Sequence, residues 1–362
     1  MTTKLAQNKL TRQTTPCFCN QFPDMAYQYL YLCEVIDRSV CMKKKFQSPL
    51  VNILSFSTTI LALALVFILF VHSSPPRPAE AEVLPEVDLF RQNYSIHALA
   101  MPQQLSFAGE DVPMHLSYVR ESYDRELLVN TYWQSSTLLL IKRANRYFPI
   151  IEPILEAEGL PADFKYLALI ESGFMERAVS PAGAAGVWQF LAGAARDYGL
   201  EVNNEIDERY HLEKSTAAAC RYLKNSYERL GSWTLSAASY NAGVRGITRQ
   251  IERQKTDNYY ELLLAEETMR YVFRILAIKE ILSRPQEFGF HLGDDDLYAP
   301  IATYDVEVNG SIEDFADFAK EHGATYRELK DLNPWLRETS LVNKAKKTYI
   351  LKLPQPGAFS VQ

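Results

Sequence analysis

The sequence predicts two structured parts, a mainly α-helical domain over residues 116–290 and a small β-α-α-β module over residues 300–355. The helical domain is indicated by long stretches with apolar residues at three- and four-residue spacing, which no lengthy apolar–polar alternation interrupts. The module is indicated by TYDVEVNG and KTYILKLP, which alternate as strands do and enclose two short helical patterns. With 362 residues, of which 47% are hydrophobic and 23% charged, the chain is long enough for both parts.

Six segments carry the helical pattern of the first part, between Ser117 and Arg284. In chain order they read RELLVNTYWQSSTLLLIKRANRYF, EPILEAEGL, ADFKYLALIES, TAAACRYLKNSYERL, TLSAASY and ELLLAEETMRYVFRILAIKEILSR. We expect the last helix to end before Pro285, because proline lacks a backbone N–H and disfavours a continuing helix. No period of repeating segments is visible, which argues against a helical-repeat interaction protein.

The N-terminal region contains the pattern of an export signal. A basic triplet follows Met42, and an apolar stretch of 19 residues, interrupted only by Ser and Thr, runs from Ile53 to Val71. This stretch is longer than a usual signal-peptide core and about as long as a bilayer is thick, which favours an uncleaved anchor over residues 42–72. Cleavage near Ala79 or Ala81 is the alternative.

The regions on either side of this signal have different expected roles. Because export signals begin at the N-terminus, we expect residues 1–41 to be an upstream extension of a true start at Met42. Residues 73–115 contain several prolines and few periodic runs, and they are predicted to form a tether and a lead-in segment. The bulk of the chain is then expected on the periplasmic side of the cell envelope, anchored to the cytoplasmic membrane or exported.

Charge and cysteine content argue against several classes of protein. Residues 1–48 hold seven basic and three acidic residues, so they carry +4 and the remainder carries −10 of the total −6. An acidic body argues against nucleic acid as the main partner. Cys220 is the only cysteine after residue 41, and its spacing from apolar neighbours predicts a core position. The six histidines are scattered without ligand spacing, so we expect no metal site and no cofactor.

Glu171 is the first candidate functional residue. At about 100° per residue, Phe164, Leu167, Ala168 and Glu171 fall on one arc of a helix, so a carboxylate occupies a position where leucine is expected. Burial disfavours the charged form of a carboxyl group, and a carboxyl that is protonated near neutral pH can act as a general acid. The structural alternative is a partly exposed glutamate near a helix end.

Three further motifs contain candidate residues, although each has a structural interpretation when taken alone. SPAGAAGVWQF combines small residues, which allow close backbone approach to a ligand, with Gln189. ASYNAG places Tyr240 and Asn241 at the end of a short apolar helix. EETMRYVFRI places Tyr271 in a helix, where a half-buried amphipathic side chain is the ordinary interpretation.

The motifs ESGF, GVWQF, YNAG and ETMRYV, in this order and at these spacings, resemble those of the lytic murein transglycosylases of the soluble-lytic-transglycosylase, lysozyme-like class. The likeness is to the membrane-bound D type and covers roughly residues 105–285. It extends to residues 303–354, which look LysM-like, although VNGSIED lacks the usual Gly-Asp-Ser/Thr run. The resemblance implies a mainly α, lysozyme-like (α+β) catalytic domain followed by a LysM-like module.

The resemblance also implies a role for each candidate residue. Glu171 matches the single catalytic acid/base, Ser172 the residue that accompanies it, and Tyr271 a tyrosine that hydrogen-bonds the catalytic carboxyl. The implied reaction cleaves the β-1,4 bond between N-acetylmuramic acid (MurNAc) and N-acetylglucosamine (GlcNAc) in peptidoglycan. The substrate's acetamido group assists, and a 1,6-anhydro-MurNAc end forms.

The resemblance implies that the remaining motif residues, together with Ser172 and Tyr271, bind the substrate. Gln189 matches a glutamine that lines the sugar groove, and Tyr240 and Asn241 match a pair that contacts the N-acetyl sugar near the scissile bond. Two alternatives stay open at this point. One is a goose-type lysozyme-like enzyme that hydrolyses the same bond, and the other is a cell-wall-binding scaffold without catalysis.

Overall fold

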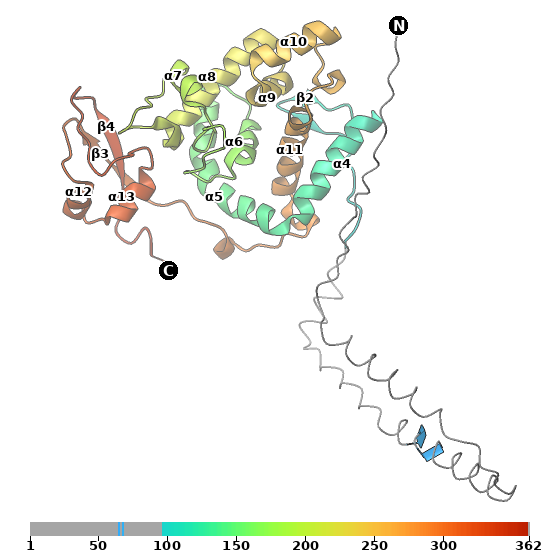
Figure 1. Ribbon diagram of the computed structural model, residues 1–362, viewed down its shortest axis with the longest axis horizontal. Helices are drawn as coiled ribbons and strands as arrows, with labels where there is room; N and C mark the ends of the chain where they lie inside the picture. Colours follow the sequence, from blue (N-terminus) through green and yellow to red (C-terminus); the bar gives the residue numbers. More distant parts are fainter. Residues whose placement is uncertain (1–63, 66, 69–95, 361–362) are drawn as a thin grey trace, which may run out of the picture. The chain divides into compact units, whose positions relative to one another are not determined.

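The computed structural model describes residues 64, 65, 67, 68 and 96–360 (Figure 1). The predicted upstream extension, residues 1–41, lies outside the described residues, as do nearly all of the predicted anchor, residues 42–72, and the predicted tether up to residue 95. Within the part of the chain that the structure describes, no helix is long and apolar enough to cross a membrane. From residue 96 onward the chain belongs to one compact unit.

The first part of this unit is mainly helical, as the sequence predicts. A short hairpin of β1 (Ser106–Phe107) and β2 (Glu110–Asp111) precedes the helices. The helices are α4 (Ser117–Tyr132), α5 (Gln134–Ala157), α6 (Phe164–Ser172), α7 (Ala192–Asp197), α8 (Leu212–Leu230), α9 (Trp233–Ala242), α10 (Val244–Gln254) and α11 (Glu266–Ser283). Four short 3-10 turns accompany them: η1 (Glu208–Tyr210), η2 (Tyr259–Glu261), η3 (Pro285–Phe288) and η4 (Asp294–Asp296).

The helix boundaries differ from the predicted segments in several places. The first segment forms two helices, because the backbone leaves helical geometry at Trp133, with φ −87° and ψ 57°. α5 then continues through Pro149 and Pro153 to Ala157, so that RYF and EPILEA belong to one helix. The apolar spacing did not predict α7 and α10. The last helix ends at Ser283, shortly before Pro285, as expected.

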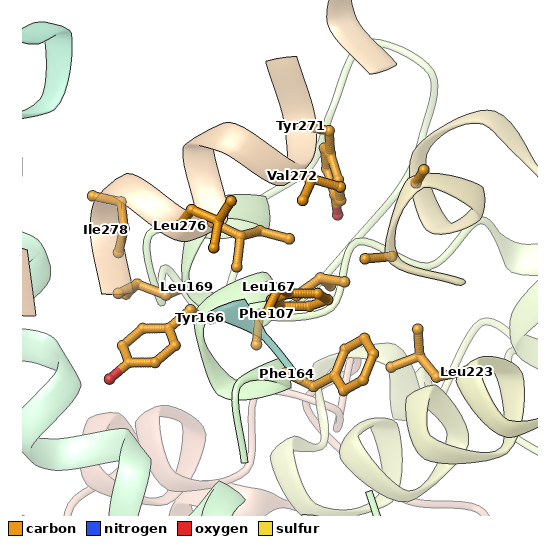
Figure 2. Close-up of a cluster of buried hydrophobic side chains, with 14 of the residues drawn as sticks. Phe107, Phe164, Tyr166, Leu167, Leu169, Leu223, Tyr271, Val272, Leu276 and Ile278 are labelled. Atoms are coloured by element: carbon orange, nitrogen blue, oxygen red, sulfur yellow. The ribbon is translucent and has the colours of Figure 1, made fainter. Parts of the chain in front are cut away.

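α11 is the central helix of this domain and packs against α4, α6 and α9. Figure 2 shows Val272 and Leu276 of α11 in one cluster with Leu167 of α6 and Phe107 of β1, and all four side chains are fully buried. Burying a side chain of this size stabilises the fold by about 1.5–3 kcal/mol. The helix that carries Glu171 is therefore held in the centre of the core.

The second part is the predicted β-α-α-β module. It consists of β3 (Thr303–Val308), α12 (Phe315–Glu321), α13 (Tyr326–Leu332) and β4 (Tyr349–Pro354). The strands are antiparallel, in a register that runs from Thr303↔Pro354 to Val308↔Tyr349. Both helices have N-caps of the kind that helix starts favour, Asp314 for α12 and Thr325 with a capping box for α13.

The module shares a hydrophobic core with the helical domain. Ile206 of the helical domain forms an isolated antiparallel bridge with Leu336, which follows α13. Ala185 and Tyr210 are buried in the same cluster as the module's Trp335. Since these apolar side chains are buried together, the module is attached by packing as well as by the connecting chain.

Candidate active site

Glu171 lies in the last turn of α6, beside the core. Phe164, Leu167 and Ala168, which the sequence places on the same helix arc, are fully buried, and the Glu171 side chain is half-buried. The helix ends at Ser172, one residue after Glu171, and the left-handed φ of 58° at the C-cap Gly173 prevents it from continuing. α6 therefore presents its only carboxylate at the edge of an apolar cluster.

Tyr271 of α11 lies directly against this carboxyl group. Its hydroxyl donates a hydrogen bond to Glu171 Oε1, and the Tyr271 side chain is almost entirely buried. The two residues are 100 positions apart in the sequence, so the packing of α6 on α11 brings them together. The resemblance led us to expect this contact.

The surroundings of Glu171 raise its pKa, so that a substantial fraction of its carboxyl groups is protonated near neutral pH. Burial raises the pKa of Glu171 to about 7, because removal from water disfavours the charged carboxylate. The hydrogen bond from Tyr271 and the positive charge of Arg274 lower this pKa in part, and the negative charge of Glu267 raises it. A carboxyl with a pKa near the working pH can both donate and accept a proton, which suits a general acid/base.

Tyr240, at the end of α9, packs beside the same site. Its hydroxyl donates a hydrogen bond to the backbone carbonyl of Trp188 at 2.8 Å, and its ring packs edge-on against Phe190 and Tyr222. Burial and then the charge of Glu171 raise the pKa of Tyr240 well above its usual value. The Tyr240 hydroxyl thus uses its proton in the bond to Trp188, and its oxygen can still accept a hydrogen bond from a ligand.

Asn241 is the neighbouring residue with a free donor. Its Oδ1 accepts a hydrogen bond from Thr268 Oγ1 at 2.7 Å, which fixes the orientation of the side-chain amide. Within the described residues no group accepts a hydrogen bond from Asn241 Nδ2, so this donor is available to a ligand. Sequence reasoning missed Thr268, although it lies inside the ETMRYV motif.

Gln189 is held more tightly by the protein than the sequence led us to expect. Its Nε2 donates hydrogen bonds to the carbonyls of Gly186, at 2.8 Å, and Ala178, at 3.3 Å. Its backbone is left-handed, with φ 48°, which costs a residue with a Cβ about 1–2 kcal/mol. The surrounding loop must offset this cost. Gln189 therefore stabilises the loop through its amide nitrogen and leaves its amide oxygen for a ligand.

Ser172 is buried, and it faces the protein. Its Oγ accepts a hydrogen bond from the backbone N–H of Phe174 at 3.1 Å. Phe174 itself has a left-handed φ of 54°, so this bond supports the sharp turn after α6. The structure gives Ser172 a role in holding the end of α6 behind Glu171.

Other titratable groups near the motifs have partners elsewhere. Glu176 lines a cavity of about 390 Å³ between the helical domain and the module, where Tyr147 is its hydrogen-bond partner. Glu201 accepts hydrogen bonds from Lys347 and Tyr349 of the module. Burial raises the pKa of the Cys220 thiol to about 12, which suits its predicted core position. Across residues 96–360 and the four described residues before them, no cluster of His, Cys, Asp or Glu is suited to a metal ion.

Comparison with known proteins identifies two domain families along the chain. Residues 148–263 match the family described as the transglycosylase SLT domain. Residues 304–357 match the soluble lytic transglycosylase C-terminal LysM-like domain. The chain therefore carries a transglycosylase SLT domain followed by a LysM-like domain.

The chain is distantly homologous to lytic murein transglycosylases of the membrane-bound D type. It is 28% identical over 244 residues to membrane-bound lytic murein transglycosylase D of Escherichia coli, in strain K12 and in an O6:H1 strain, which covers 65% of this chain and 52% of the relative. A putative tributyltin chloride resistance protein of Alteromonas sp. strain M-1 is 29% identical over 125 residues, covering 34% of this chain and 60% of that protein. The chain thus matches about half the length of the D-type relatives.

Proposed function

We propose that this protein is a peptidoglycan lytic transglycosylase that cleaves the MurNAc–GlcNAc β-1,4 bond and leaves a 1,6-anhydro-MurNAc end. The observation that carries the proposal is the Glu171–Tyr271 pair, a desolvated carboxyl that receives a hydrogen bond from a neutral tyrosine. The transglycosylase SLT domain around Glu171 supports the substrate class, as does the LysM-like module behind it.

In the first step Glu171 acts as the general acid. Its proton passes to the oxygen that joins the two sugars, and the bond from this oxygen to the MurNAc anomeric carbon breaks. Positive charge develops at that carbon, where the acetamido oxygen of the same sugar stabilises it. The free Nδ2 donor of Asn241 can hold this acetamido group, because Thr268 already fixes the amide's orientation.

In the second step Glu171 acts as the general base. The carboxylate formed in the first step takes the proton of the MurNAc 6-hydroxyl, whose oxygen closes onto the anomeric carbon. The proton returns to Glu171 and no water is consumed, so the reaction is formally that of a lyase. The hydrogen bond from Tyr271 stabilises the transient carboxylate between the two steps, since it favours the charged form.

We further propose that the protein acts in the cell envelope on glycan strands within reach of an N-terminal anchor. The likeness to a membrane-bound relative supports this location. An intact-mass measurement of the natural product decides whether residues 1–41 and 42–72 are present in the mature chain. A peptide from within residues 1–41 would contradict the expected start at Met42.

Product analysis tests the proposed reaction. The protein is incubated with purified peptidoglycan, and the soluble muropeptides are weighed by mass spectrometry. We expect fragments about 18 Da lighter than hydrolysis products, the mass of one water, and their loss in Glu171→Gln. Glu176→Gln is a matched control, because it removes another half-buried carboxyl with a tyrosine partner, outside the candidate site. Hydrated reducing ends would favour the lysozyme-like hydrolase, and binding without release would favour the scaffold.

A further inference from the structure

The segment that contains Gln189 is supported from behind by residues far along the chain. We call residues 178–190 the groove loop, because they carry the glutamine expected to line the sugar groove. Within this loop the Ala185 N–H donates to the Phe190 carbonyl and the Gly186 N–H to the Ala178 carbonyl, both at 3.0 Å. These bonds join parts of one short segment, and a segment of this kind needs external contacts to hold a single shape.

Arg209 supplies the main polar contacts from outside the groove loop. Its Nη1 donates hydrogen bonds to the carbonyls of Gly183, at 2.9 Å, and Phe190, at 3.2 Å. Its Nε and Nη2 form a two-pronged pair with the carboxylate of Asp207, at 2.9 and 2.6 Å. The planar guanidinium group thus has fixed bonds on both edges, which only arginine can make.

The backbone of Arg209 also lies directly against the groove loop. A Cβ at Gly186 would come within 1.9 Å of the Arg209 carbonyl oxygen, and the φ of Gly186 is 78°. Any side chain there would push the groove loop away from residue 209. The close approach explains why the loop carries a glycine at this point.

The LysM-like module holds the other side of the Arg209 segment. The Asp207 N–H donates to the Trp335 carbonyl at 2.9 Å, and the Arg337 N–H donates to the Glu205 carbonyl at 2.8 Å. These two bonds and the bridge between Ile206 and Leu336 extend the segment as a short strand pair. The same segment is therefore bonded to the module through its backbone and to the groove loop through the Arg209 side chain.

Apolar packing and a stacked cation accompany these bonds. Ala185 of the groove loop, Ile206 and Leu336 are each 1% exposed and belong to one cluster. The guanidinium of Arg337 lies over the ring of Tyr210, 4.2 Å from its centre. Removal of the module would expose this cluster to water, so the groove loop and the module are expected to be ordered together.

We propose that the LysM-like module braces the wall of the substrate groove, with Arg209 as the positioning residue that connects the two. The support passes from Leu336 through the segment 205–207 to Arg209, and from Arg209 to the carbonyls on both sides of Gln189. The assignment of a groove at this loop rests on the proposed function. The module thereby contributes to the reaction from a distance, whether or not it binds glycan itself.

Two variants of the full chain test the brace from its two ends. Leu336→Ala removes apolar packing on the module side of the bridge, and Arg209→Ala removes the side chain that joins the segment to the groove loop. We expect both to speed amide hydrogen exchange at Ala185 and Gly186 at least about tenfold, while α6 and α11 keep their protection. Lys347→Ala is the matched control, because Lys347 joins the same two parts through an exposed ion pair with Glu201, 3.0 Å long, and contacts neither Leu336 nor Arg209 by an ion pair or hydrogen bond.

Kinetics separate positioning from a general loss of structure. On a soluble glycan substrate we expect both variants to lower kcat/KM about tenfold, mainly through KM, with the pH profile centred where it is in the unaltered protein. Arg209→Lys keeps the positive charge but lacks the two-pronged geometry. We expect its kcat/KM to exceed that of Arg209→Ala by less than about threefold.

The hydrogen-exchange measurement tests the support of the groove loop without depending on catalytic activity. Unchanged exchange at Ala185 and Gly186 in Leu336→Ala would overturn the brace, even if the unaltered protein releases anhydro products. Exchange that rises equally in every helix would also overturn it, because the effect would then be global. If the unaltered protein releases no anhydro products, the proposed function fails, while the exchange comparison still decides the brace.

Discussion

Two partly buried carboxyl groups in this protein, Glu171 at the candidate active site and Glu213 beside the LysM-like module, have pKa values shifted in opposite directions. Burial raises the pKa of Glu171 to about 7, and its hydrogen-bond partner is the neutral hydroxyl of Tyr271. Burial also acts to raise the pKa of Glu213, but His211 at 3.2 Å and Lys352 at 3.0 Å outweigh it and lower this pKa to about 2.

The difference shows that the charge of the partner decides the protonation of a buried carboxyl. A cation in direct contact stabilises the carboxylate, whereas a neutral donor does so only in part. Two arginines on the helix of Tyr271, Arg270 and Arg274, lie beside a different carboxylate, that of Glu126. Glu126, which is 1% exposed, pairs with Arg270 at 2.6 Å and has Arg274 at 3.8 Å. Glu171 therefore faces a neutral partner, although arginines lie on the same helix as Tyr271.

The largest expected difference is between the reaction rates of two variants that each lack one of these carboxylates. We expect Glu171→Gln to lower the rate of anhydro-product formation by about 10³-fold or more, because the only proposed acid/base is lost. Glu213→Gln should change this rate by less than about threefold, since its carboxylate serves an ion-paired contact. Rates of product release from peptidoglycan measure both. Comparable losses in the two variants would contradict the assignment of Glu171.

The neutral partner can be removed while the carboxyl stays. Tyr271→Phe deletes the hydroxyl that favours the carboxylate, so we expect the pKa of Glu171 to rise above about 7 and the rate to fall about 10- to 100-fold. The pH profile of kcat/KM measures the shift. A profile that moves toward acid would show that the hydroxyl favours the protonated carboxyl instead.

Stability as a function of pH should change in opposite directions for the two carboxylates. The raised pKa of Glu171 stabilises the fold below about pH 4.5, and this contribution is lost as pH rises through about 7. Glu171→Gln should therefore increase the free energy of unfolding above pH 7, relative to the unaltered protein, by on the order of 3 kcal/mol.

Glu213 contributes in the opposite sense. Its lowered pKa stabilises the fold above about pH 4.5, and this contribution is lost as pH falls toward about 2. Glu213→Gln should therefore destabilise the protein at neutral pH by about 1–2 kcal/mol, with the difference shrinking in acid. Denaturant unfolding at several pH values measures both variants. The contrast fails if both variants shift stability with the same sign at pH 8.

The smallest expected effect concerns Arg274, which acts on Glu171 through its charge alone. Since this charge lowers the pKa of Glu171, Arg274→Gln should move the upper limb of the pH–rate profile toward alkali by about a few tenths of a unit. High salt should reduce the difference between the variant and the unaltered protein. A shift toward acid would contradict the sign.

Much of the fold follows from local patterns in the sequence. Apolar spacing identified α4, α6, α8, α9 and α11, and strict alternation identified β3 and β4, because these patterns report which face of an element is buried. They failed at Trp133, where two helices meet without an interruption of the apolar pattern, and at Pro149 and Pro153, where α5 continues although each proline removes one helical hydrogen bond.

The site was predictable only in part, for a physical reason. Glu171 is recognisable because a charged residue in an apolar arc is unusual at any position. The Thr268–Asn241 contact, the Arg209–Asp207 pair and the attachment of the module at Ile206 join distant parts of the chain. Periodicity contains no information about such contacts. The functional roles of all six candidate residues stay predictions: Glu171, Ser172, Gln189, Tyr240, Asn241 and Tyr271. The structure shows which of their atoms the protein already uses.

The most direct test of the account is a titration of the Glu171 carboxyl itself. Carbon-13 NMR of protein labelled at glutamate side chains, compared with Glu171→Gln, isolates the signal of this one group. We expect a midpoint of about 7, far above the ordinary value for glutamate, because burial disfavours the charged carboxylate. A midpoint near 4.5 would show that Glu171 is ionised at neutral pH, and it would contradict the proposal that burial beside a neutral tyrosine prepares it as the general acid.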